Sequence, residues 1–84
     1  MNHTADPAKR RAYRLRDHEH AMATLAAIRV ARRTPLRKLG ILLDTTRQQI
    51  GRWLNGQQVP RADRVFELAN ALGYDVAFVP REDA

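Results

Sequence analysis

Two short helical patterns, separated by a few polar residues, constrain this chain more than any other feature. Residues 34–56 read TPLRKLGILLDTTRQQIGRWLNG. Thr34-Pro35 is typical of a helix start, where a capping hydroxyl precedes a proline whose missing N–H costs nothing. Leucines then recur at helical spacing, at Leu36, Leu39 and Leu43. The sequence therefore predicts one helix that begins near Pro35.

A polar interruption follows that helix and leads to a second one. The run Asp44-Thr45-Thr46 carries side chains that hydrogen-bond to nearby backbone amides, so it predicts a turn near residues 44–46. Thr46 can cap a helix that covers about residues 46–54. Within this helix Gly51 costs about 1 kcal/mol of helix propensity relative to alanine, which indicates a packing or close-approach role.

The second helix has one apolar and one polar side. Ile50 and either Trp53 or Leu54 share a face, and long polar side chains surround the opposite face. Arginine can bond guanine and glutamine can bond adenine with two hydrogen bonds, each good pair discriminating by roughly 1–3 kcal/mol. The residues predicted to read DNA bases are Thr46, Arg47, Gln48, Gln49 and Arg52.

At these positions the chain resembles the lambda-repressor-like helix-turn-helix family, the Cro/CI or xenobiotic-response-element type of regulator. The resemblance covers roughly residues 25–79 and includes the recognition-helix opening TTRQQI. The matching core and loop positions are Leu39, Leu43, Ile50, Asn55-Gly56, Pro60, Leu68, Ala69, Leu72 and Gly73. It implies an all-α fold of four to five helices, with Arg47 and Gln48 placed where family members touch base edges.

Three residues depart from the family pattern. Gly40 replaces the usual alanine, Asp44 stands where the turn commonly has glycine, and Leu36 replaces a glutamine that often binds phosphate. Aspartate tolerates left-handed backbone better than most residues, so Asp44 is an acceptable substitute. Losing the glutamine removes one phosphate contact and leaves the implied fold intact.

Positive charge is concentrated in the first two thirds of the chain. The net charge is +6; residues 1–33 carry eight Lys or Arg against three acids, 34–54 four against one, and 55–84 three against five. A polyanion partner explains this asymmetry, and a solvated basic face is the alternative. The candidate phosphate contacts are Lys9, Arg10, Arg11, Arg14, Lys38 and Asn55.

The chain divides into an arm, a domain and a tail. Residues 1–16 form a basic arm that either extends the first helix, follows DNA, or remains a disordered solubilising tail. Residues 17–73 form the helix-turn-helix domain, whose first packed helix covers about 17–33 on a stripe of Met22, Leu25 and Ile28. Its last helix has Val65, Leu68, Ala69 and Leu72 on one face and ends at Gly73.

Residues 74–80 alternate β-branched and aromatic side chains and end at a proline, which predicts a short strand within the 74–84 tail. A lone strand needs a partner for its backbone hydrogen bonds, so we expect it to pair with its copy in a homodimer. The predicted dimer contacts are Tyr74, Val76, Phe78 and Val79. An extended tail that covers the core is the alternative.

Catalytic and metal functions are not expected. The chain contains neither serine nor cysteine, and His18 and His20 point in different directions on a helix. We therefore expect no enzyme activity, cofactor or metal. No apolar run approaches the ~20 residues of a membrane span and no secretory signal is visible, so a cytoplasmic protein is expected.

These features predict a sequence-specific double-stranded DNA-binding regulator. We expect a repressor that acts by occlusion, as a homodimer on a palindromic operator, in one of two settings. One is a phage Cro-like regulator, and the other is an antitoxin that represses its own operon and binds a cognate toxin protein. The alternative is a protein–protein interaction module of helix-turn-helix fold that has only non-specific DNA affinity.

Overall fold

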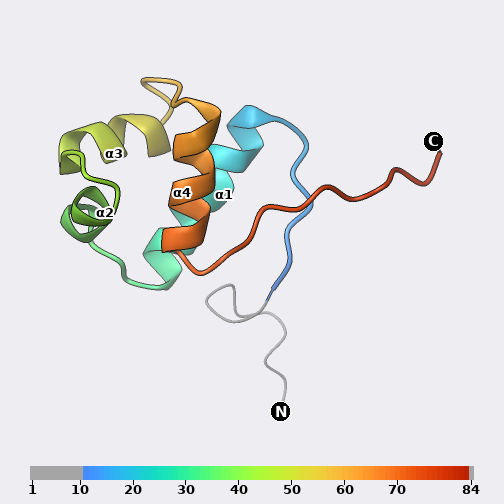
Figure 1. Cartoon of the computed structure of the whole chain (residues 1–84), viewed down its shortest axis with the longest axis horizontal. Coiled ribbons are helices and arrows are strands. Elements are labelled where there is room, and N and C mark those ends of the chain that lie inside the picture. Colours follow the sequence, from blue (N-terminus) through green and yellow to red (C-terminus); the bar gives the residue numbers. More distant parts are fainter. Residues whose placement is uncertain (1–10, 84) are drawn as a thin grey trace, which may run out of the picture.

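The computed structural model describes residues 11–83 and contains four helices in that part of the chain (Figure 1). They are α1 (His18–Ala31), α2 (Leu36–Leu42), α3 (Arg47–Leu54) and α4 (Ala62–Ala71). The expected all-α architecture with a helix-turn-helix is confirmed: α2 packs chiefly on α3, and α1 and α4 lie against this pair. Across residues 11–83, none of the helices has the length and apolar character that crossing a membrane requires.

Side chains fix the start of two helices. Asp17 Oδ1 accepts a hydrogen bond from the His20 N–H (2.8 Å) at α1, and Thr46 Oγ1 accepts one from the Gln49 N–H (3.1 Å) at α3. Each bond satisfies a backbone donor that has no partner inside the helix. The prediction of Thr34 as the cap of α2 is wrong, because Pro35 itself occupies the N-cap position with extended backbone, at φ −66° and ψ 147°.

Close backbone approach defines the turn between α2 and α3. Asp44 adopts the left-handed conformation (φ 56°), which the short aspartate side chain tolerates. On α2, a Cβ at Gly40 would lie 2.9 Å from the carbonyl oxygen of Thr45, so only glycine allows this spacing. The two short helices therefore pack at a distance that depends on Gly40.

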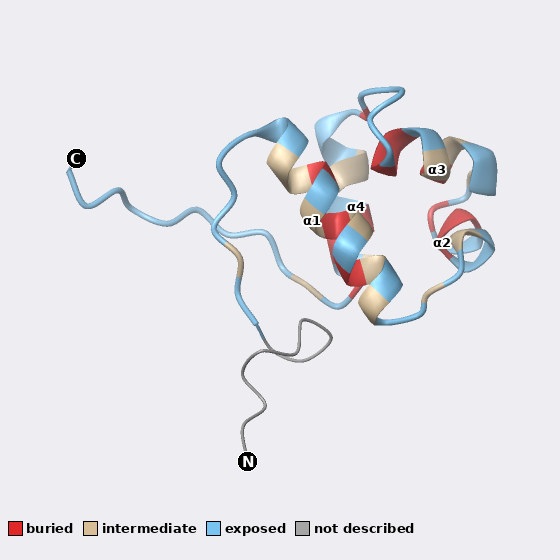
Figure 2. Ribbon diagram, turned by 180° about the vertical axis from the view of Figure 1, so that it is seen from behind, coloured by how far each residue is buried: buried red, intermediate tan, exposed pale blue. Residues whose placement is uncertain are grey.

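One apolar cluster joins all four helices, and the buried residues in Figure 2 face the centre of the bundle. Ile50, Leu39 and Leu68 are fully buried, so α3, α2 and α4 meet at its middle. Burying one such side chain stabilises a fold by about 1.5–3 kcal/mol. The cluster consists of Met22, Leu25, Ile28, Leu39, Leu43, Ile50, Trp53, Leu54, Leu68, Ala69 and Leu72.

The predicted C-terminal strand is wrong for the single chain. Gly73 ends α4 with φ +89°, and residues 74–80 then run as extended coil away from the helices (Figure 1). A strand exists only when a neighbouring backbone pairs with it in a ladder, and no strand forms within residues 11–83 of the single chain. The β-forming composition produces an extended backbone here without a sheet.

The described part of the basic arm is not helical. Residues 11–16 have no regular structure, and the arm crosses the tail on the side of the molecule away from α2 and α3 (Figures 1 and 2). The ring of Tyr13 on the arm lies 5.9 Å from the ring of Tyr74, which follows α4. The guanidinium groups of Arg11 and Arg32 lie over these rings, at 5.5 and 5.4 Å from the respective centroids.

Candidate nucleic-acid interface

Helix α3 has a buried side and an exposed side, with Gln49 and Gly51 half-buried between them. Ile50 is completely buried, Trp53 and Leu54 are nearly so, and all three pack into the core. Because 3.6 residues make one turn, this packing leaves Arg47 and Gln48 exposed at the start of the helix, with Arg52 one turn further along. The structure thus brings these three predicted base-reading residues together on one outer surface.

A shallow hollow lies on this exposed side of α3, and it is bordered by the first residue of α2 and by the loop that follows α3. Gly51 forms part of its floor, where a Cβ would meet only Leu36 Cδ1, at 3.7 Å. Packing inside the protein therefore does not require a glycine at position 51. The lining residues are Leu36, Arg47, Gln48, Gly51, Arg52, Asn55 and Gln57.

Gln57 also lines this hollow, although the helical sequence pattern did not predict it there. Gly56 has φ +84°, and the chain turns back so that the N–H groups of Gln57 and Gln58 donate to the Arg52 carbonyl, at 2.9 and 3.1 Å. This turn places Gln57 in the lining of the same hollow as Arg47, Gln48 and Arg52. A glycine directly after a helix is the only sequence signal that could have suggested it.

The other two predicted base readers are engaged within the protein. The Thr46 hydroxyl accepts the capping hydrogen bond from Gln49 N–H. Gln49 is half-buried, and its Nε2 donates to Gln58 Oε1 at 2.5 Å. Gln49 therefore borders a second hollow, lined by Gln49, Trp53, Gln58, Val59, Pro60, Arg61 and Arg64, and not the one beside Arg47.

The predicted phosphate contacts occupy two separate regions. Lys38 is exposed on α2, and Asn55 lines the hollow beside α3, where its Oδ1 accepts a hydrogen bond from the Gln57 N–H (3.1 Å). Arg11 and Arg14 are exposed on the arm, at the opposite end of the molecule (Figure 1). Lys9 and Arg10 lie outside the described residues.

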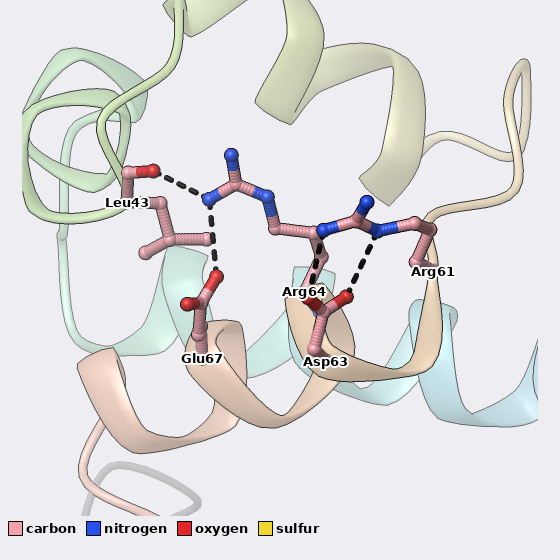
Figure 3. A network of polar contacts seen from close by, with 5 residues as sticks. All are labelled: Leu43, Arg61, Asp63, Arg64 and Glu67. Carbon is pink, nitrogen blue, oxygen red and sulfur yellow. Dashed lines mark hydrogen bonds and ion pairs between the residues drawn. The ribbon is translucent and has the colours of Figure 1, made fainter.

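Charge at the start of α4 is balanced locally. Arg61 and Asp63 form an exposed pair with a 2.8 Å contact between Arg61 Nη2 and Asp63 Oδ2 (Figure 3). The hydrogen bond from Arg61 holds the pKa of Asp63 below its usual value, and the same bond raises the pKa of Arg61. Asp63 also lies in the first helical turn, where a negative charge is favoured.

The four predicted dimer contacts do not share one environment. Tyr74 is half-buried against Tyr13, Arg32 and the core of its own chain. Val76, Phe78 and Val79 are exposed, and Phe78 retains 98% of its accessible surface. The tail thus carries apolar side chains that the described part of its own chain does not cover.

Comparison with known proteins adds one finding. A family model described as helix-turn-helix matches residues 25–79, well over half of the 84-residue chain. The matched range includes all of α2, α3 and α4, the second half of α1 and the first part of the tail. No curated protein and no solved structure matched the chain.

Proposed function

Because the chain belongs to the Cro/C1-type helix-turn-helix family, a family of DNA-binding transcription regulators, we propose that it represses transcription from a specific duplex sequence. One observation carries the proposal. Arg47, Gln48 and Arg52 form a single exposed surface on α3, held in place by the buried Ile50 behind them. A helix with this surface fits the major groove, where arginine and glutamine distinguish base pairs by hydrogen bonding.

Phosphate contacts complete the proposed complex. Lys38 and Asn55 flank the reading surface on either side in the chain, and each has side-chain N–H donors that can bind phosphate oxygens. Such contacts orient the protein on DNA without reading sequence. Arg11 and Arg14 are additional phosphate contacts in our proposal, reached by a reorientation of the arm or by a second DNA segment.

We further propose that the protein acts as a homodimer on a palindromic operator. The exposed tail residues Val76, Phe78 and Val79 support this, because a second copy could bury them and pair with their backbone. Two copies related by a twofold axis would present two α3 helices to half-sites about one helical turn apart. A phage Cro-like regulator and an autoregulating antitoxin with a cognate toxin both fit this arrangement.

Electrophoretic mobility shift with a duplex selected from a random pool, and with the promoter region of the gene itself, tests the proposal. We expect the Arg47→Ala/Gln48→Ala double variant to lose about 1–3 kcal/mol of discrimination for each lost base contact. Arg81 is an exposed arginine of the tail, so Arg81→Ala is the matched control and should keep the preference for the selected duplex. Equal weak binding of all duplexes by the wild type, erased by salt, would refute sequence-specific binding and favour the protein-interaction alternative.

A further inference from the structure

Arg64 on α4 contacts both helices of the helix-turn-helix. Its Nη1 donates to the Leu43 carbonyl oxygen at 2.5 Å and to Glu67 Oε1 at 3.0 Å (Figure 3). Its guanidinium carbon lies 5.7 Å from the centre of the Trp53 ring on α3. One side chain, 25% exposed, therefore joins α4, the end of α2 and α3.

The hydrogen bond from Arg64 to the Leu43 carbonyl can fix the backbone where the turn begins. Leu43 is the C-cap of α2, and the last carbonyls of a helix have no partner inside it. A cation at this end also interacts favourably with the helix dipole. Asp44, directly after it, adopts the left-handed backbone that starts the turn. Arg64 thus contacts the backbone at the residue where the chain leaves α2 for α3.

The second contact is with α3 itself. Trp53 is buried with only 7% of its surface accessible, and it lies on the side of α3 opposite the reading surface. A guanidinium group over this ring is attracted to it electrostatically and links α4 to α3, and a lysine ammonium group on a flexible stem does not reproduce its planar shape. Glu67 holds the guanidinium from its own helix, one turn further along.

We propose that Arg64 is a positioning residue that sets the angle of the recognition helix by tying both the turn and Trp53 to α4. The expected effect on base readout rests on the proposed function, whereas the positioning itself is argued from the contacts of Arg64 alone. Base readout depends on this angle, because hydrogen bonds to base edges weaken steeply when misaligned. Phosphate contacts on flexible side chains tolerate such a change. Loss of Arg64 therefore reduces sequence preference more than total DNA affinity.

The DNA test compares Arg64→Met and Arg64→Lys with Arg61→Met. Arg61 is the matched control because it lies at the start of the same helix, its side chain is 80% exposed, and it forms its ion pair with nearby Asp63. All variants are titrated with the selected duplex and a scrambled duplex over a salt series, at a temperature where each is fully folded. We expect Arg64→Met to lower the specific-to-nonspecific affinity ratio about tenfold or more, with Arg64→Lys restoring part of it.

Salt dependence separates positioning from direct phosphate contact. A positioning role predicts that Arg64→Met and Arg61→Met change the slope of log affinity against log salt by the same amount. If Arg64→Met instead lowers affinity for both duplexes equally and reduces the slope by about 1 more than the control does, Arg64 is a phosphate contact and the proposal is overturned. An unchanged affinity ratio also overturns it.

A measurement without DNA keeps this proposal separate from the proposed function. Amide and indole chemical shifts of wild type, Arg64→Lys and Arg61→Met report whether the turn and Trp53 sense the side chain. We expect Arg64→Lys to shift the Asp44 and Thr45 amides and the Trp53 indole, and Arg61→Met to leave them in place. If those signals do not move, Arg64 does not hold the turn, whatever the DNA result. If they move but no duplex is preferred, the proposed function fails and the positioning role of Arg64 at the turn stands.

Discussion

Two glycines in the helix-turn-helix illustrate how one residue type serves different purposes. At Gly40, a Cβ would collide with the Thr45 backbone, so the glycine is required by the fold of the chain itself. At Gly51, a Cβ would make only an ordinary contact with Leu36. Glycine in a helix costs about 1 kcal/mol relative to alanine, so Gly51 lowers stability without an internal packing reason. Close approach of a DNA backbone or base edge to α3 is the role we propose for it.

We expect Gly51→Ala to stabilise the folded protein by up to about 1 kcal/mol and to weaken specific DNA binding. Urea unfolding measures the first effect, and titration with the selected duplex measures the second. Gly40→Ala is the control. It gains the same helix propensity, but its Cβ would lie 2.9 Å from the Thr45 carbonyl oxygen, so a net loss of stability is expected. Unchanged DNA affinity in Gly51→Ala would remove the close-approach role.

At the scale of elements, α3 depends on its cap and α4 on its first-turn charges. Eight residues are too few for a stable isolated helix, so α3 requires both its buried face and the hydrogen bond from Gln49 N–H to Thr46. Arg61, the N-cap residue of α4, makes no side-chain capping hydrogen bond, and Asp63 supplies negative charge in the first turn of that helix. A single substitution that removes one of these contacts should therefore weaken the helix start and lower the free energy of unfolding.

Thr46→Ala should lower the free energy of unfolding by about 1 kcal/mol, because it leaves the Gln49 N–H without its capping acceptor. Thr46→Ser keeps the hydroxyl and should stay close to wild type. Urea denaturation of the three proteins under identical conditions measures the difference. If Thr46→Ala and Thr46→Ser are equally stable, the hydroxyl does not stabilise the start of α3.

The effect of Asp63→Asn should depend on pH. Because the pKa of Asp63 is lowered in the folded state, chiefly by the hydrogen bond from Arg61, the carboxylate contributes stability at pH values above its unfolded pKa of about 3.9. That contribution disappears as the pH falls through the folded pKa. We expect wild type to be the more stable protein at pH 7, with the difference vanishing toward pH 2. Urea unfolding at pH 7, 5, 3 and 2 tests this, and a constant difference would contradict it.

At the scale of the whole molecule, the reading surface and the tail lie at opposite ends. Helices α2 and α3 form one end in Figure 1, and the tail and described arm leave from the other. The contact of Tyr13 with Tyr74 joins the arm to the tail, and Arg32 at the end of α1 lies over the Tyr74 ring. A dimer formed through the tail would therefore leave both α3 surfaces uncovered and would bring the arms close to the interface.

We expect Phe78→Asp to convert a dimeric wild type into a monomer, because the change places a charge on the most exposed apolar side chain of the tail. Ile41→Asp on α2, where the native side chain is 72% exposed, is the control and should leave the oligomeric state unchanged. Sedimentation equilibrium over a concentration series decides between these outcomes. A monomeric wild type would exclude the tail-mediated homodimer.

Local rules account for much of this fold. The spacing of Leu39, Leu43 and Ile50 predicted two packed helices, Thr46 predicted the start of α3, and Asp44 could adopt the left-handed turn. Each of these features depends on residues within one or two helical turns in the chain. Sequence alone was therefore sufficient for the all-α helix-turn-helix and for placing Arg47, Gln48 and Arg52 on one exposed surface of α3, whereas their role in reading bases stays a prediction.

Tertiary structure decided what depends on distant partners. Arg64 meets the Leu43 carbonyl across 21 positions, and Gln57 joins the reading surface only because the chain turns back after α3. Residues 74–80 had the composition of a strand, yet strand pairing requires a second backbone that local propensity cannot supply. Helical hydrogen bonds close within four residues, whereas strand pairing and the contacts of long side chains depend on which distant segments the packed core brings together.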